Sequence, residues 1–235
     1  MNRPIAHFGL ALALFALAGH DAAASDLVVV EAHGVRLAPG QAVDGSKPLS
    51  LADGQQVTLL SSTGQILKLE GPSETAPDSQ VQGRGDQASA VSALLTERQA
   101  RTSEVGVVRG ETTVKLPDPW VVDVTHPGTS CVTYGRPVVL WRSEDLGQSQ
   151  VAISPADRSW TVSGSWPAAA DRLQMPANLP LRDHTSYVIN VGGKMAPVTM
   201  RLIPAAVDND VMRASWMAEV GCDNQANALL AMLKK

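Results

Sequence analysis

The sequence predicts a mainly β protein with three parts: a small N-terminal antiparallel β module, a β-sandwich and a C-terminal helical hairpin. Short runs of alternating apolar and polar residues recur through residues 28–72 and 120–202, and turn-forming Gly, Pro and Asp pairs separate them. This alternation predicts strands that bury one face. Apolar residues three and four positions apart appear near the end of the chain, where they predict helices.

Residues 1–24 have the three regions of a secretory signal peptide. Arg3 gives a positive start, residues 8–17 are apolar, and three alanines precede Ser25. The apolar run is about half the length that a membrane-spanning helix needs. We therefore expect cleavage after Ala24, a periplasmic or secreted protein, and no transmembrane anchor after cleavage.

The best-defined element of the N-terminal module, residues 25–72, is a hairpin formed by residues 56–61 and 65–70. Its three-residue connection ends at Gly64, which supplies the left-handed residue that a type I turn with a G1 bulge requires. This turn fixes the strand register. The register pairs apolar residues on one face: Leu59 with Leu67, and Val57 with Leu69.

The order of strands and turns from Gly34 to Pro72 is G-V-R-L…P-G-Q…L-x-L-x-x-G-x-x-V-x-L…G-x-x-L-x-L-x-G-P. It resembles the short repeated strands of FecR-type periplasmic domains and of uncharacterised secreted bacterial proteins with such a module at the N-terminus. The resemblance implies a bacterial envelope protein. FecR sensors also have a membrane span and a cytoplasmic tail, neither of which we recognise here, so signalling by that route is not implied. A generic β meander is the other interpretation.

Residues 73–111 are predicted to be a linker with a short helix. Their first part has almost no large apolar residue and contains the tripeptide Arg84-Gly85-Asp86, a receptor-ligand motif that also arises readily by chance. Ser89 is expected to cap a helix over residues 90–101. Its apolar side, which we expect to pack on a sheet, consists of Val91, Leu94 and Leu95.

Short strands separated by turns predict a β-sandwich of Ig-like architecture over residues 112–205. The run from Asp183 to Tyr187 resembles the D-x-x-x-Y pattern of a tyrosine corner, but Ile189 stands where an immunoglobulin domain has its second Cys. The proline-broken stretch 166–181 is predicted to be an edge or binding loop. The strand candidates are residues 120–124, 130–134, 138–142, 150–153, 159–163, 187–191 and 197–202.

Two helices are predicted over residues 206–235. Asp208 or Asn209 caps the first, and Gly221 provides its left-handed stop. Asp223 is expected to cap the second. One apolar face of the second helix contains Ala226, Leu229, Leu230 and Leu233.

Cys131 and Cys222 are the two cysteines of a chain bound for an oxidising compartment, so we predict a structural disulfide. Closing this loop removes about 4–5 kcal/mol of unfolded-state entropy in the chain-entropy model. Reduction is expected to loosen residues 208–235 first and to leave residues 28–72 protected. The competing interpretation makes Cys131 a nucleophile activated by His126.

Candidate chemistry is otherwise thin. The histidines are scattered without metal-ligand spacing, and no cofactor motif is present, so we expect neither metal nor cofactor. Trp160 and Trp166 are candidate ligand-binding residues, forming an aromatic platform for a sugar or a peptide. Filling of the core is the other interpretation of these tryptophans.

The sequence therefore favours an exported, non-catalytic binding or interaction module of the bacterial cell envelope. Its expected partner is a protein, a peptide or a cell-envelope glycan. The formal net charge of -4 is spread without blocks, which argues against nucleic acid. The alternative function is an envelope hydrolase with a site near His126 and Cys131.

Overall fold

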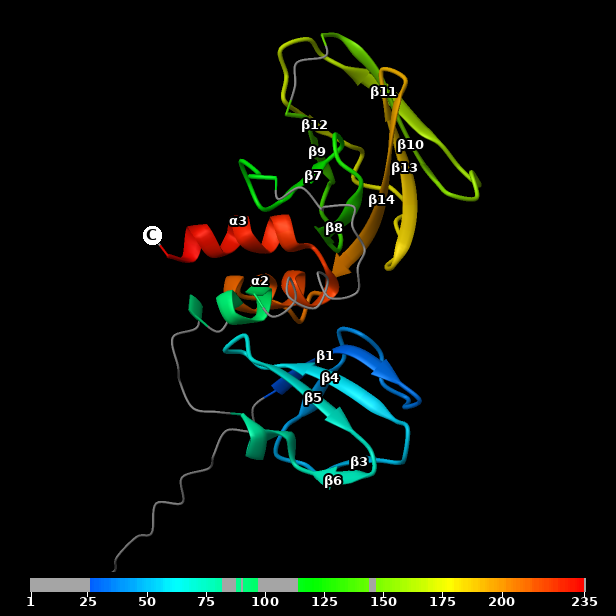
Figure 1. The fold of residues 1–235 in the computed structure, drawn as a ribbon. Helices are drawn as coiled ribbons and strands as arrows, with labels where there is room; N and C mark the ends of the chain where they lie inside the picture. Colours follow the sequence, from blue (N-terminus) through cyan, green and yellow to red (C-terminus); the bar gives the residue numbers. More distant parts are fainter. Residues whose placement is uncertain (1–25, 82–87, 90, 97–113, 144–146, 235) are drawn as a thin grey trace, which may run out of the picture.

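The computed structural model describes residues 26–81, 88–89, 91–96, 114–143 and 147–234. It confirms the predicted fold class. An N-terminal β module and a β-sandwich lie on opposite sides of a helical pair, α2 (Asp210–Val220) and α3 (Asp223–Leu233) (Figure 1). The predicted signal peptide lies outside the described residues. Within them, no helix is both long and apolar enough to cross a membrane.

The N-terminal module contains a four-stranded antiparallel sheet in the order β2-β1-β4-β5. A smaller two-stranded sheet closes its other side, and the 3-10 helix η1 (Pro77–Gln80) follows. The strands are β1 (Asp26–His33), β2 (Ala42–Asp44), β3 (Leu49–Leu51), β4 (Gln56–Leu60), β5 (Ile66–Glu70) and β6 (Ser73–Thr75).

The predicted hairpin is confirmed in turn and register. The backbone N–H of Ser61 donates to the carbonyl of Gln65 at 2.9 Å, and Gly64 has a φ of 83°. Leu59 faces Leu67 and Val57 faces Leu69, as predicted. All four side chains are buried, whereas Lys68 and Glu70 on the opposite face are exposed.

Strand β1 is buried on both faces. Leu27 and Val29 contribute to the core of the module, while Val28 and Val30 pack against the helical pair. A strand covered on both sides needs a continuous apolar run rather than alternation, which explains the uninterrupted valines. Lys68 Nζ and Glu219 Oε1, 2.7 Å apart, link β5 to α2 at the same interface.

The N-terminal module continues beyond residue 72, so the predicted start of the linker was wrong. Ser73–Thr75 form β6, which pairs with β3. All three residues of β6 are polar, and the ladder forms through their backbone groups. Residues 88–89 and 91–96 are helical, which places Ser89 inside the helix rather than at its cap. The buried side chains of Val91 and Leu95 join the core around α2. The Arg-Gly-Asp tripeptide lies outside the described residues.

The sandwich has a five-stranded sheet, β11-β10-β13-β14-β8, packed on a three-stranded sheet, β12-β9-β7. Most neighbours are antiparallel, but β14 with β8 and β7 with β9 are parallel. The strands are β7 (Val121–Asp123), β8 (Gly128–Thr133), β9 (Val139–Trp141), β10 (Ser149–Pro155), β11 (Val162–Trp166), β12 (Arg172–Gln174), β13 (Thr185–Val191) and β14 (Lys194–Ile203).

Two details of the predicted sandwich need correction. The strand expected at residues 159–163 begins three positions later, at Val162, and β12 lies within the stretch expected to be a loop. The tyrosine-corner resemblance is borne out, since the backbone N–H of Arg182 donates to the Tyr187 hydroxyl at 2.8 Å.

The helical pair follows its capping signals with one correction. Asn209 caps α2 through a 2.9 Å bond from the backbone N–H of Met212, and Gly221 ends the helix with a φ of 90°. Cys222, not Asp223, is the cap residue of α3. Asp223 is instead the first helical residue, where its negative charge interacts favourably with the positive end of the helix dipole.

Candidate functional site

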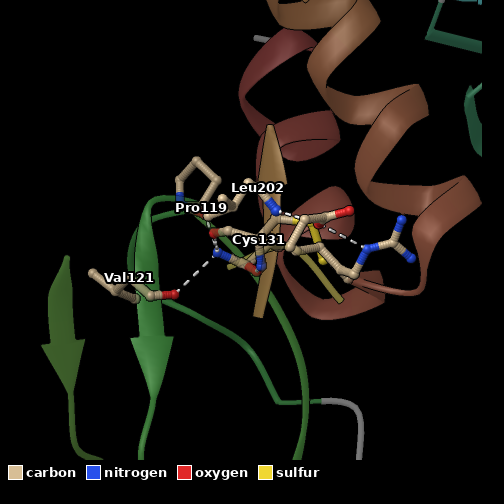
Figure 2. Close-up of a disulfide and its surroundings, with 8 residues drawn as sticks. Pro119, Val121, Cys131 and Leu202 are labelled. Atoms are coloured by element: carbon tan, nitrogen blue, oxygen red, sulfur yellow. Dashed lines mark hydrogen bonds and ion pairs between the residues drawn. A yellow bond between two sulfur atoms is a disulfide. The ribbon is translucent and has the colours of Figure 1, made fainter. Parts of the chain in front are cut away.

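The predicted disulfide is present and completely buried. Cys131 of β8 and Cys222, between the two helices, have sulfur atoms 2.01 Å apart and Cα atoms 5.8 Å apart (Figure 2). The bond links the edge of the sandwich to the helical pair. Because neither cysteine is a free thiol, Cys131 is not a nucleophile. The alternative prediction of a hydrolase that uses Cys131 as its nucleophile was therefore wrong.

Gln225 of α3 reinforces this link. Its Oε1 accepts a 2.6 Å bond from the backbone N–H of Cys131, and its Nε2 donates to the Cys131 carbonyl at 2.8 Å. The same amide nitrogen donates to the carbonyls of Pro119 and Val121, at 2.9 and 3.2 Å, which converge beside the disulfide (Figure 2). The buried side chain of Gln225 thus makes the hydrogen bonds to Cys131 that the backbone of a neighbouring strand would otherwise make. The sequence analysis missed it, because an amide on an apolar helix face carries no strand signal.

On the other side of Cys131, β14 is fixed by a carboxylate. Arg201 is the partner of Cys131 in the parallel ladder, and Asp183 Oδ1 lies 3.2 Å from its Nε. The same oxygen accepts a 2.8 Å bond from the backbone N–H of Leu202. Side chains therefore satisfy the backbone N–H and C=O of Cys131 and the backbone N–H of Leu202, and these contacts hold the structure together beside the disulfide.

His126, the predicted base of the alternative hydrolase, belongs to a turn. Its Nδ1 lies 2.8 Å from Asp123 Oδ2. Asp123 Oδ1 accepts a 2.7 Å bond from the backbone N–H of Thr125, so the carboxylate organises the turn between β7 and β8. Within the described part of the chain, no group of three His, Cys, Asp or Glu residues is placed to bind a metal.

The two candidate tryptophans do not form an exposed platform. Trp166 is 0% exposed, its indole N–H donates to the Ala170 carbonyl at 2.8 Å, and the Arg142 guanidinium lies 4.8 Å from its ring centroid. Trp160 is partly buried, with its ring centroid 5.8 Å from that of Tyr187. The prediction that Trp166 binds a ligand was therefore wrong, and its role is core packing.

A different surface stands out on the sandwich. Side chains of β10, β13 and β14 alternate between the core and the side of the five-stranded sheet that faces away from the three-stranded sheet. The residues on that side, which we call the outer sheet face, are Gln150, Ala152, Ser154, Ser186, Val188, Asn190, Met195, Pro197 and Thr199.

None of these nine residues is charged. The next outward residue of β14 is Arg201, whose side chain is 15% exposed and lies 3.2 Å from Asp183 Oδ1. Val188 is opposite Pro197 in the ladder, which places two apolar groups side by side near its centre. Met195, which is 69% exposed, lies at one end, and the hydroxyls of Ser186 and Thr199 are 3.2 Å apart. Alternation in the sequence reveals which residues point outward, but not which strands are neighbours, so this surface was missed.

No protein-family model matches this chain, and no match was found among the curated proteins. Chemically, the described residues offer a buried covalent and hydrogen-bonded link beside α3, and a partly exposed surface of nine uncharged residues on the five-stranded sheet. The first stabilises the molecule. The second is able to contact a partner.

Proposed function

We propose that this protein is an exported, non-catalytic interaction module of the bacterial cell envelope that binds a protein partner through the outer sheet face. The absence of charge from these nine neighbouring residues carries the proposal. The centres of protein interfaces are depleted of charged residues and enriched in residues such as Met. A sheet face with Val188, Pro197 and Met195 rimmed by hydroxyl and amide groups has this composition.

A protein partner fits this face better than a glycan does. Sugars are commonly bound by stacking on exposed aromatic rings, and the nine residues of the outer sheet face include no aromatic residue. Of the two candidate tryptophans, Trp166 is buried inside the sandwich, and Trp160 is partly buried with its ring beside that of Tyr187. The small hydroxyl and amide groups instead suit hydrogen bonds around an apolar contact with another protein.

The disulfide supports export, because such bonds form and persist in oxidising compartments. The signal-like residues 1–24 and the FecR-like order of strands and turns support the envelope as the destination.

Site-specific photo-cross-linking in the producing bacterium tests this function. A photoreactive residue replaces Val188 in one variant and Asp53, an exposed residue of the N-terminal module, in the matched control. We expect a discrete protein adduct from position 188 that is absent from position 53 and weakened by Pro197→Lys, which places a charge beside it. Identical adducts from both positions, or none from position 188, would overturn the proposal.

A further inference from the structure

Strand β11 forms one open edge of the five-stranded sheet. It pairs with β10 on one side only. Its three central residues, Ser163, Gly164 and Ser165, are exposed. Among the described residues, no backbone hydrogen bond reaches β11 from its other side. The outward N–H and C=O groups of this strand are therefore available for another strand to pair with.

The other outer strands of the three larger sheets are protected by charge or by side chains. β11 is the exception, since residues 162–166 include no charge and no proline. Charged side chains protect three of the remaining edges: Asp44 and Lys47 at β2, Lys68 and Glu70 at β5, and Arg172 and Asp118 at β12. At the other two edges, β7 and β8, the Gln225 amide bonds to the backbone.

The sequence of β11 is complementary to itself when read in the antiparallel direction. A twofold axis through Gly164 would place Ser163 of one copy opposite Ser165 of the other, twice. Cross-strand hydroxyls can hydrogen-bond, and glycine on the axis keeps side chains out of the closest approach of the two backbones. Among the described residues, a Cβ at Gly164 would meet only Val151 Cγ1 within 4 Å, at 3.8 Å.

We propose that the partner of this edge is a second copy of the chain. Two β11 strands pair antiparallel about Gly164 and join two five-stranded sheets into one continuous sheet. The twofold axis is perpendicular to that sheet, so both outer sheet faces lie on the same side of the dimer. Ser163 and Ser165 project to the same side of the sheet as Ala152 and Gln150, their partners in β10. The dimer nevertheless does not depend on the proposed function, because it forms through the backbone edge of β11 and not through the nine residues of the outer sheet face.

Two matched double variants test the pairing by sedimentation equilibrium of the full mature chain from roughly micromolar to millimolar concentration. Ser163→Lys with Ser165→Lys places like charges opposite each other twice across the axis. Ser163→Lys with Ser165→Glu places opposite charges there. Both change the same two exposed positions, and equal melting temperatures would show that both variants fold.

We expect concentration-dependent dimerisation of the unmodified chain. The Lys/Lys variant should dimerise about tenfold more weakly, and the Lys/Glu variant at least as strongly as the unmodified chain. A chain that stays monomeric throughout the concentration range overturns the proposal. Equal weakening by both variants also overturns it, because only antiparallel self-pairing distinguishes the two charge patterns.

Discussion

Gly64 meets two requirements at the residue scale. Its φ of 83° disfavours any side chain, and a Cβ there would stand 2.5 Å from Val211 Cγ1 and 2.8 Å from Ser215 Oγ on α2. Gly64→Val should therefore lower the free energy of unfolding by about 2–4 kcal/mol, adding a packing clash to backbone strain. Urea denaturation measures this change.

Gly54 provides the matched control. It has a φ of 74°, yet a Cβ there would meet nothing within 4 Å. Gly54→Val should cost only the backbone strain, about 1–2 kcal/mol. Equal costs at the two positions would show that the contact between the hairpin turn and α2 contributes no stability.

Asp44 gives a prediction for acid solution. Hydrogen bonds from Lys47 and Ser46 lower the pKa of this carboxyl group from 3.8 to about 2. Because the pKa is lower in the folded state, the carboxylate stabilises the fold fully above pH 3.8, and this contribution is lost as the pH falls toward 2.

NMR titration of the carboxyl carbons measures this pKa directly. Lys47→Ala should raise it toward the ordinary value, since Lys47 is the largest cause of the shift. Asp157 is the internal reference, because hydrogen bonds from Ser159 lower its pKa independently of Lys47. A pKa of Asp44 near 3.8 in the unmodified protein would contradict the prediction.

At the scale of elements, Gln225 joins α3 to the sandwich beside the disulfide. Gln225→Leu keeps the side-chain volume similar but leaves the buried N–H and C=O of Cys131 without their partners. We expect a loss of about 2–4 kcal/mol in the free energy of unfolding. Chemical denaturation measures it.

Asn227 on the same helix is the control for this substitution. Its side chain donates to the carbonyl of Asp223 within the helix at 2.9 Å and does not reach the sandwich. Asn227→Leu should change the stability by less than about 1 kcal/mol. If both variants lose the same stability, the contacts of Gln225 with β7 and β8 are not what joins α3 to the sandwich.

Local signals explain which elements the sequence predicts correctly. The hairpin register follows from Gly64 and short-range alternation, and the ends of α2 follow from Asn209 and Gly221. β6 and β12 have three residues each, too few to show a period, and both contain polar residues. The parallel ladders join strands far apart in the chain, which local alternation cannot detect.

The candidate sites show the same division. The disulfide was predictable because the chain has only two cysteines and a signal-like start. For Trp166 the sequence offered two interpretations, a ligand platform and core filling, and could not decide between them because it does not say that Arg142 and the Ala170 carbonyl lie against its ring. The outer sheet face depends on the pairing of β10, β13 and β14, which only the folded chain reveals.

At the scale of the whole molecule, the N-terminal module and the helical pair share one core, to which the edge of the sandwich contributes Cys131 and Ile203. Val28, Val30 and Leu60 of the N-terminal module belong to the same buried cluster as Cys131, Cys222 and the inner faces of α2 and α3. The disulfide therefore lies in a core on which the N-terminal module also depends. This arrangement revises the expectation that residues 28–72 stay protected when the bond is lost.

Replacing both cysteines by alanine should lower the free energy of unfolding by about 2–5 kcal/mol, because the bond closes a loop between residues 91 positions apart. Amide hydrogen exchange should lose protection first in α2 and α3 and next in β1, whose Val28 and Val30 pack on them. β10 and β13 should keep theirs, since they lie in the separate core of the sandwich. Loss of protection in β10 at the same rate as in β1 would contradict a sandwich core that is separate from the core around the helices. If β1 kept its full protection from hydrogen exchange, the N-terminal module would be stable without its contacts to α2.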